Sequence, residues 1–183
     1  MTKSVAIVTG ASQGIGRSTA IRLARDFEAL VLVARNRGKL EATAGEIEKL
    51  GKKVLIVETD LAEISAPGMI VEETLARFGR IDALLNIAGA VPQIDLFEMT
   101  DEQWDAGFAL KLYGARRLTI AAWPALKEAR GRLSSSRVTP RNSPRRPMRP
   151  WERSTPRSWR SPRPFPIVGS RTGCRLTAYC PAR

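Results

Sequence analysis

Short apolar runs alternate with longer segments whose apolar residues recur every three or four positions along residues 1–130. The short runs have the continuity of strands buried on both faces of a parallel sheet, and the longer segments have the stripe of amphipathic helices. The predicted strands are residues 4–8, 30–34, 54–57 and 81–86, and the predicted helices are 17–27, 39–50, 69–78 and 101–130. Pro124 is expected to kink or end the last helix. This alternation predicts an α/β fold with a doubly wound parallel sheet.

A glycine-rich turn joins the first predicted strand to the first predicted helix. Glycine lets the backbone turn tightly and approach a pyrophosphate, and a helix N-terminus offers free N–H groups and the positive end of the dipole. We therefore predict a dinucleotide site at this turn, which reads T-G-x-x-x-G-x-G. Its predicted binding residues are Gly10, Ser12, Gln13, Gly14, Ile15 and Gly16.

The spacing of this turn resembles that of the short-chain dehydrogenase/reductase family. A second motif agrees, because Asn86-Ile87-Ala88-Gly89 resembles the N-N-A-G of that family, although N-x-A-G alone would be an ordinary turn. The resemblance implies a Rossmann-type fold and an NAD(P) cofactor. It also implies hydride transfer to or from a small hydroxy or keto compound, with Asn86, Ala88 and Gly89 beside the cofactor. Family members associate as homo-oligomers, in part through the helix predicted at residues 101–130.

The segment Arg35-Asn36-Arg37 follows the second predicted strand and bears on the choice of cofactor. An acidic residue here accepts hydrogen bonds from the ribose of NAD, whereas an arginine accommodates the 2′-phosphate of NADP. The sequence offers arginines and no acid, which favours NADP and leaves NAD open. Two other observations temper this preference. Surface arginines also solvate loops, and Gln13 stands where NADP-preferring members often carry a basic residue.

Three further residues acquire roles from the resemblance. Asp60 and Leu61 follow the third strand, where the family places a carboxylate and an apolar residue against the adenine; Asp60 alone would equally suit a helix N-cap. Lys111 stands where the family carries an asparagine that orders a proton-relay water, so Lys111 is the catalytic candidate of this chain. A solvent-facing helix lysine is the other interpretation of Lys111.

Composition divides the chain into two unlike pieces. Residues 131–183 contain 13 of the 30 basic residues, one of the 18 acidic residues and 9 of the 12 prolines, so residues 1–130 are electrically balanced. We predict a partial NAD(P)-binding domain over residues 1–130 and a disordered Arg/Pro/Ser-rich tail over residues 131–183. Arginines of such a tail suit nucleic-acid phosphates. We do not expect that partner, because a shift of the reading frame would account for the arginines without a function.

Other classes of protein are not indicated by the sequence. The chain has no histidine and two cysteines, so no metal site is expected. The first residues do not have the pattern of a signal peptide and no apolar run approaches a membrane span, so cytoplasm is the expected location and no membrane association is expected.

The tail lacks the chemistry that the resemblance implies there. The family has a fifth strand ending in a catalytic serine, followed by Tyr-x-x-x-Lys on a helix; residues 131–183 contain Tyr179 and no lysine. Ser134 to Ser136 lie near the expected serine, but no strand is predicted to hold them. Reading the codons from a shifted base permits family-like sequence, including a closing V-N-x-x-x-P-G-P.

We therefore hypothesise a frameshift or truncation after about residue 130, which accounts for the arginines without a function. It leaves four strands, an uncovered edge at Leu84 and Leu85, an incomplete subunit contact, and an impaired or inactive oxidoreductase. The alternative is a non-enzymatic nucleotide-binding module.

Overall fold

A parallel sheet forms the centre of the fold. The computed structural model describes residues 4–90, 94–95, 97–135 and 175–176. Within them the strands run in the order β3-β2-β1-β4-β5-β6, and every neighbouring pair is parallel. Their bounds are β1 Val5–Thr9, β2 Ala29–Ala34, β3 Lys53–Glu58, β4 Ala83–Asn86, β5 Arg132–Ser135 and β6 Arg175–Leu176.

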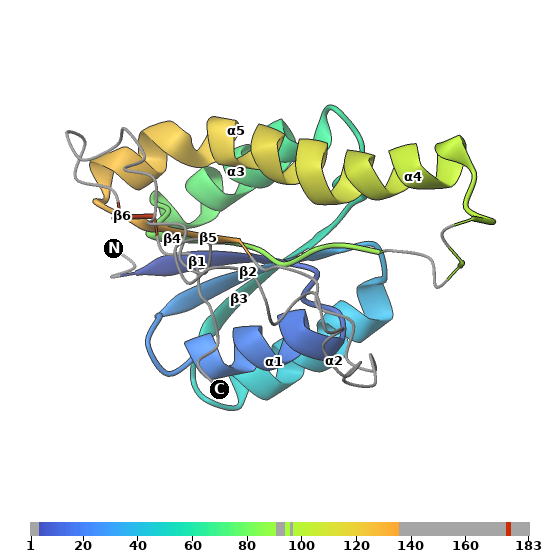
Figure 1. Cartoon of the computed structure of the whole chain (residues 1–183). Helices are drawn as coiled ribbons and strands as arrows, with labels where there is room; N and C mark the ends of the chain where they lie inside the picture. The colour runs from blue at the N-terminus through green and yellow to red at the C-terminus, as the bar shows by residue number, and fades with distance from the viewer. Residues whose placement is uncertain (1–3, 91–93, 96, 136–174, 177–183) are drawn as a thin grey trace, which may run out of the picture.

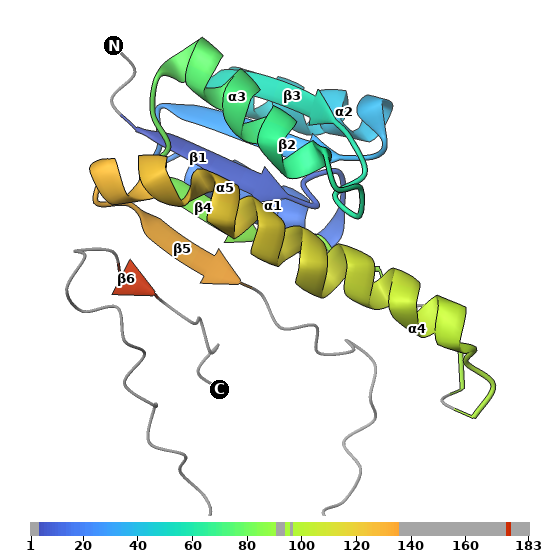
Figure 2. The same cartoon turned by 90° about the horizontal axis from the view of Figure 1, so that it is seen from above.

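Helices cover both faces of this sheet, which confirms the predicted doubly wound α/β fold. α1 and α2 lie on one face, and α3 and α5 lie on the other (Figure 1). Figure 2 shows that α4, η1 and α5 form one continuous rod whose α4 end projects beyond the sheet. The helices are α1 Gly14–Leu23, α2 Arg37–Glu48, α3 Ala66–Phe78, α4 Asp101–Phe108, the π-helix η1 Ala109–Gly114 and α5 Ala115–Glu128.

Alternate residues of β1 enter different halves of the core. Val5 and Ile7 belong to the buried cluster that includes residues of α3 and α5, whereas Ala6 and Val8 belong to the cluster formed with α1 and α2. All four side chains are fully buried. Burial on both faces explains why this strand is a continuous apolar run rather than an alternating one.

The prediction of four strands and an uncovered β4 was wrong, because β5 pairs with β4. Leu85 lies opposite Ser134 and Asn86 opposite Ser135, so a strand does hold these two serines. Leu84 is fully buried. In β5, of sequence R-L-S-S, only Leu133 is aliphatic, so the strand depends on backbone pairing, which hydrophobic periodicity does not reveal.

Pro124 does not end the last helix, since α5 continues to Glu128. Leu118, Ala122 and Leu126 are fully buried on either side of the proline. Tertiary packing supplies most of the stability of a protein helix, so this buried face holds the helix together across one missing N–H donor.

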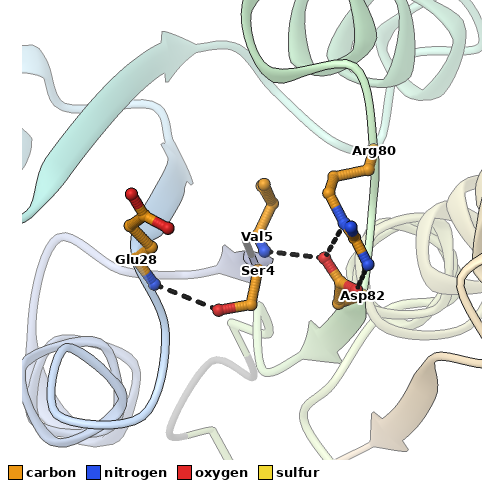
Figure 3. Close-up of polar contacts among 5 residues, drawn as sticks. All are labelled: Ser4, Val5, Glu28, Arg80 and Asp82. Carbon is orange, nitrogen blue, oxygen red and sulfur yellow. Dashed lines mark hydrogen bonds and ion pairs between the residues drawn. The ribbon is translucent and has the colours of Figure 1, made fainter. Parts of the chain in front are cut away.

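Asp82 joins neighbouring strands at their amino-terminal ends. Figure 3 shows Asp82 Oδ2 accepting hydrogen bonds from Val5 N at 2.8 Å and from Arg80 Nε at 2.9 Å. The Asp82 carbonyl accepts from Arg132 N at 2.8 Å. One residue therefore joins the start of β1, the approach to β4 and the start of β5. The pairing with Asp82 raises the pKa of the Arg80 guanidinium.

Candidate functional site

A cleft of about 500 Å³ opens at the carboxyl ends of the central strands. β1 has β2 on one side and β4 on the other, so this is the point where the strand order reverses and where α/β sheets bind ligands. Segments that follow β1, β2, β3 and β4 all contribute to its wall. Predicted cofactor residues that line it are Gly10, Ser12, Gln13, Gly14, Ile15, Gly16, Arg35, Asp60, Leu61, Ala88 and Gly89.

The glycine turn is packed so closely that two of its glycines leave no room for a side chain. A Cβ atom on Gly16 would lie 2.0 Å from the carbonyl oxygen of Gly10. Gly10 has a φ of +71°, and its own Cβ would lie 2.9 Å from Ala88 Cα. Gln13, the N-cap of α1, makes no side-chain capping hydrogen bond. The first turn of α1 therefore presents backbone N–H groups at the cleft, as an anion-binding helix terminus does.

The hydroxyl of Thr9 joins the glycine turn to the loop after β4. Thr9 is fully buried. Its Oγ1 accepts hydrogen bonds from the backbone amides of Ile87 and Ala88, both at 3.0 Å, and donates to the carbonyl of Leu85 at 3.3 Å. Two walls of the cleft are thus held together by one side chain. Sequence reasoning assigned no role to Thr9, although its place at the last position of a buried strand is a signal for such a bond.

Arg35, after β2, and Asp60, after β3, face one another in the wall of the cleft. Arg35 Nη1 lies 3.5 Å from Asp60 Oδ2, and Asp60 Oδ1 accepts a hydrogen bond from Ala62 N at 2.9 Å. The N-cap of α3 is Ser65, so the interpretation of Asp60 as the cap of that helix was wrong. Leu61, next to it, is buried and lines the cleft.

The structure separates the two arginines of the Arg35-Asn36-Arg37 segment. Arg37 Nε donates to Glu41 Oε1 at 2.9 Å on the outer surface of α2, and Arg37 is not among the residues that line the cleft. A lysine that the sequence analysis did not select, Lys39, lines the cleft instead, and its Nζ donates to Gln13 Oε1 at 2.8 Å.

Asn86 lies beneath the loop rather than in the wall of the cleft. Its side chain is buried, and its Nδ2 donates to Thr119 Oγ1 of α5 at 3.1 Å. Among the described residues its Oδ1 has no hydrogen-bond partner. Strand pairing sets Ser135 beside Asn86 at the carboxyl end of β5. Two polar residues therefore lie side by side at the carboxyl ends of β4 and β5.

Lys111 is partly buried and is not among the residues that line the cleft. It lies in the π-helix η1. A Cβ atom added to Gly89 would lie 2.9 Å from Lys111 Cδ and 3.6 Å from Lys111 Nζ, so the side chain lies against this loop. Burial lowers the pKa of the Lys111 ammonium. π-Helical turns occur frequently at functional sites, because they redirect side chains within an otherwise regular helix.

The described ranges contain neither a candidate metal site nor a candidate membrane span. They contain no group of three His, Cys, Asp or Glu residues that could hold a metal ion. No helix in the same part of the chain is long and apolar enough to cross a membrane.

Comparison with known proteins agrees with this geometry. The profile of the family described as short chain dehydrogenase matches residues 4–134. The chain therefore belongs to the short-chain dehydrogenase family. A relative from Arabidopsis thaliana, 11-beta-hydroxysteroid dehydrogenase-like 2, is 34% identical over 136 residues, which cover 73% of this chain and 44% of the relative.

Solved structures share the fold. A metagenomic short-chain oxidoreductase in complex with NADP has a TM-score of 0.68 and 34% identity, covering 74% of this chain and 62% of that chain. L-Sorbose reductase from Gluconobacter frateurii, complexed with NADPH and L-sorbose, has a TM-score of 0.69 and 32% identity, covering 74% and 52%. The chain thus spans about half the length of these relatives.

Proposed function

We propose that residues 4–135 form the cofactor-binding part of an NADP-dependent oxidoreductase that acts on a hydroxy or keto compound. The observation that carries the proposal is one cleft that combines bare glycine amides at the start of α1 with the cation of Arg35 after β2. The first turn of α2 contains no acidic residue to accept hydrogen bonds from an unphosphorylated ribose. This combination favours NADP over NAD.

Binding of the two nucleotides to the full-length protein tests the proposal. NADPH and NADH are titrated separately and followed by their fluorescence, and NADPH should bind more tightly. Gly16→Ala should abolish binding of both, because the new Cβ would meet the Gly10 carbonyl. If the folded wild-type protein binds neither nucleotide, the proposed function is wrong.

The cleft residues fit the parts of the cofactor in order. Asp60 and Leu61 would hold the adenine, the glycine turn the pyrophosphate, and Ala88 and Gly89 the nicotinamide ribose. The nicotinamide, when bound, gives or accepts a hydride. We place Lys111 at this end, since its side chain lies against Gly89, and assign to it a hydrogen bond to the cofactor or substrate.

Turnover by this chain should be small. Its sequence contains no Tyr-x-x-x-Lys, and a positioned acid/base group typically contributes about 10²–10⁴-fold to a rate. The expected rate of NADPH-dependent reduction of a panel of ketones is therefore near background. Turnover at the rate of an ordinary enzyme would contradict this part of the proposal.

We retain the frameshift hypothesis in the proposal, but we place the frameshift a few residues later in the chain. The family match ends at residue 134 and β5 ends at Ser135, which supports a change after about residue 134 rather than 130. The predictions of disorder and of nucleic-acid binding concern residues that, apart from 131–135 and 175–176, lie outside the described ranges. Resequencing the gene across the codons for residues 125–140 tests the hypothesis, and an unchanged reading frame in independent isolates would contradict it.

A nucleotide-binding module without turnover is the second candidate. The missing Tyr-x-x-x-Lys favours it, whereas the polar pair of Asn86 and Ser135 at the substrate end favours an oxidoreductase ancestry. Tight NADPH binding with no reduction of any ketone would support the module.

Association between copies is also proposed, through the rod formed by α4, η1 and α5. Its exposed large apolar residues include Trp104, Phe108 and Leu112, each more than 40% exposed. Apolar area of this kind marks interaction surfaces and aggregation-prone ones alike. Sedimentation of the full-length protein distinguishes a defined oligomer from aggregates. A cytoplasmic location accompanies the proposal and is tested by fractionating cells of the source organism.

A further inference from the structure

Two cations, on different elements, line the adenosine end of the cleft. Arg35 follows β2, and Lys39 lies in the first turn of α2. The Asn36 side chain caps this helix by accepting a hydrogen bond from Lys39 N at 2.9 Å. Side chains of helical residues point toward the helix N-terminus, so this cap directs Lys39 back toward the glycine turn.

Gln13 completes the placement of Lys39. The Lys39 ammonium donates to the Gln13 side-chain oxygen at 2.8 Å, which brings a positive charge from α2 to the glycine turn, 26 positions earlier in the chain. The amide of Gln13 is neutral. Within the described ranges, no carboxylate lies within ion-pair distance of the Lys39 ammonium.

Two of the neighbouring cations form ion pairs outside the cleft, and only Arg35 stays within it. Arg37 pairs with Glu41 and Arg17 pairs with Glu46, both outside the cleft lining. Arg35 is held by Asp60 at 3.5 Å. Lys39 is thus a cleft-lining cation that is positioned by a neutral group, and its charge is available to an anion.

We propose that Lys39 binds the 2′-phosphate of NADP together with Arg35, and that Gln13 positions Lys39 for this contact. The inference rests on the proposed function and adds the residue that discriminates NADP from NAD. Arg35 supplies the planar guanidinium and Lys39 a compact point charge, an arrangement suited to a phosphate monoester. Arg37 takes no part.

Binding measurements on the full-length protein test the inference. NADPH, NADH and adenosine 2′,5′-bisphosphate are titrated against wild-type protein and the variants Lys39→Ala, Lys39→Arg and Arg37→Ala. One charge-assisted hydrogen bond lost should weaken NADPH and the bisphosphate about 10-fold to 100-fold in Lys39→Ala. NADH affinity should change less than about 3-fold, because NADH has no group at this position.

The other variants separate charge from packing. Lys39→Arg should retain most of the affinity for NADPH, and Arg37→Ala should bind all three ligands as the wild type does. Equal weakening of NADPH and NADH in Lys39→Ala, or no weakening of NADPH, would overturn the role of Lys39 while leaving NADPH binding by the wild type intact. A wild type that binds neither nucleotide would overturn the proposed function and this inference together.

Gln13 is tested as a positioning residue. Gln13→Ala should weaken NADPH less than Lys39→Ala does, and it should weaken NADH less than it weakens NADPH. The double variant Gln13→Ala with Lys39→Ala should be no weaker than Lys39→Ala alone, since Gln13 acts through the lysine. Additive losses would show that Gln13 contacts the phosphate independently and would contradict its assigned role.

Discussion

The hydroxyl oxygen of Thr9 lies 3.0 Å from the backbone nitrogen of Ala88, and this bond joins the glycine turn after β1 to the loop after β4. The same oxygen accepts from Ile87 N. Replacing Thr9 by Val keeps the shape and removes the acceptor. Leaving buried donors unpaired costs about 1–3 kcal/mol, so Thr9→Val should lower the free energy of unfolding by that amount.

Thr9→Ser is the matched control for this variant, because it retains the hydroxyl. Urea denaturation of both variants provides the measurement. A Thr9→Val protein as stable as Thr9→Ser would show that the bonds to the loop contribute nothing.

Gly16 is expected to tolerate no side chain, since a Cβ there would lie 2.0 Å from the Gly10 carbonyl oxygen. Gly16→Ala must therefore displace the turn, and NADPH affinity should fall by about 100-fold or more. Isothermal titration measures the loss.

The control for this substitution is Gly45 within α2, where an added Cβ meets nothing within 4 Å. Gly45→Ala should raise the free energy of unfolding by about 0.5–1 kcal/mol, because alanine is the better helix former, and should leave NADPH binding unchanged. Loss of binding in both variants would argue against a local role for Gly16.

Asp82 should contribute more to stability than an exposed carboxylate does. Asp82→Ala leaves Val5 N and the Arg80 guanidinium without their partner, and an unsatisfied donor of this kind costs about 1–3 kcal/mol. Asp26, which pairs with Arg22 on the surface of α1, provides the comparison. Asp26→Ala should cost less than about 1 kcal/mol, and equal losses by thermal denaturation would contradict the role given to Asp82.

Burial of Lys111 predicts a dependence of stability on pH. The folded protein lowers the pKa of this ammonium below its usual 10.5, so the folded state releases the proton before the unfolded state does. Wild-type protein should therefore gain stability relative to Lys111→Met as the pH rises through the lowered pKa of the folded state toward 10.5, where the unfolded state also becomes neutral. Urea denaturation of the wild type and Lys111→Met across this pH range provides the measurement, and a difference in stability that does not change with pH would contradict the prediction.

Two ligands of different length test at which end of the cleft Lys111 lies. Lys111→Ala should weaken NADPH several-fold and leave adenosine 2′,5′-bisphosphate unaffected, because the bisphosphate has no nicotinamide half. Lys39→Ala should weaken both. Loss of bisphosphate binding in Lys111→Ala would contradict the placement of Lys111 at the nicotinamide end.

Most of the sheet and its helices could be predicted from the sequence, because β1 and β2 are continuous apolar runs and the apolar residues of the helical segments recur every three or four positions. β5 was not predicted, since its pairing with β4 uses backbone groups and only Leu133 is aliphatic. Pro124 misled the prediction of the helix end, because the packing of Leu126 beyond it is a tertiary effect.

The sequence motifs predicted which turns form the cleft, but they did not predict correctly which cations line it. The sequence placed Arg35 and Arg37 on an equal footing, although Glu41 stands four residues after Arg37 and indicates an ion pair along the helix. The position of Lys39 in the cleft could not be predicted, because it depends on how α2 is rotated about its axis. The Asn36 cap and the packing of Leu40 against the sheet determine that rotation. The roles of these residues toward a nucleotide stay predictions.

The π-helix η1 divides the long rod into two angular registers. One residue advances an α-helix by about 100°, so removing a single residue between Ala109 and Gly114 would turn α4 by about that angle relative to α5. Trp104 and Phe108 would swing to another side of the rod while Leu118 stayed in the core. Deletion of one codon would in this way change the direction in which the apolar surface of α4 faces and leave the sheet unchanged.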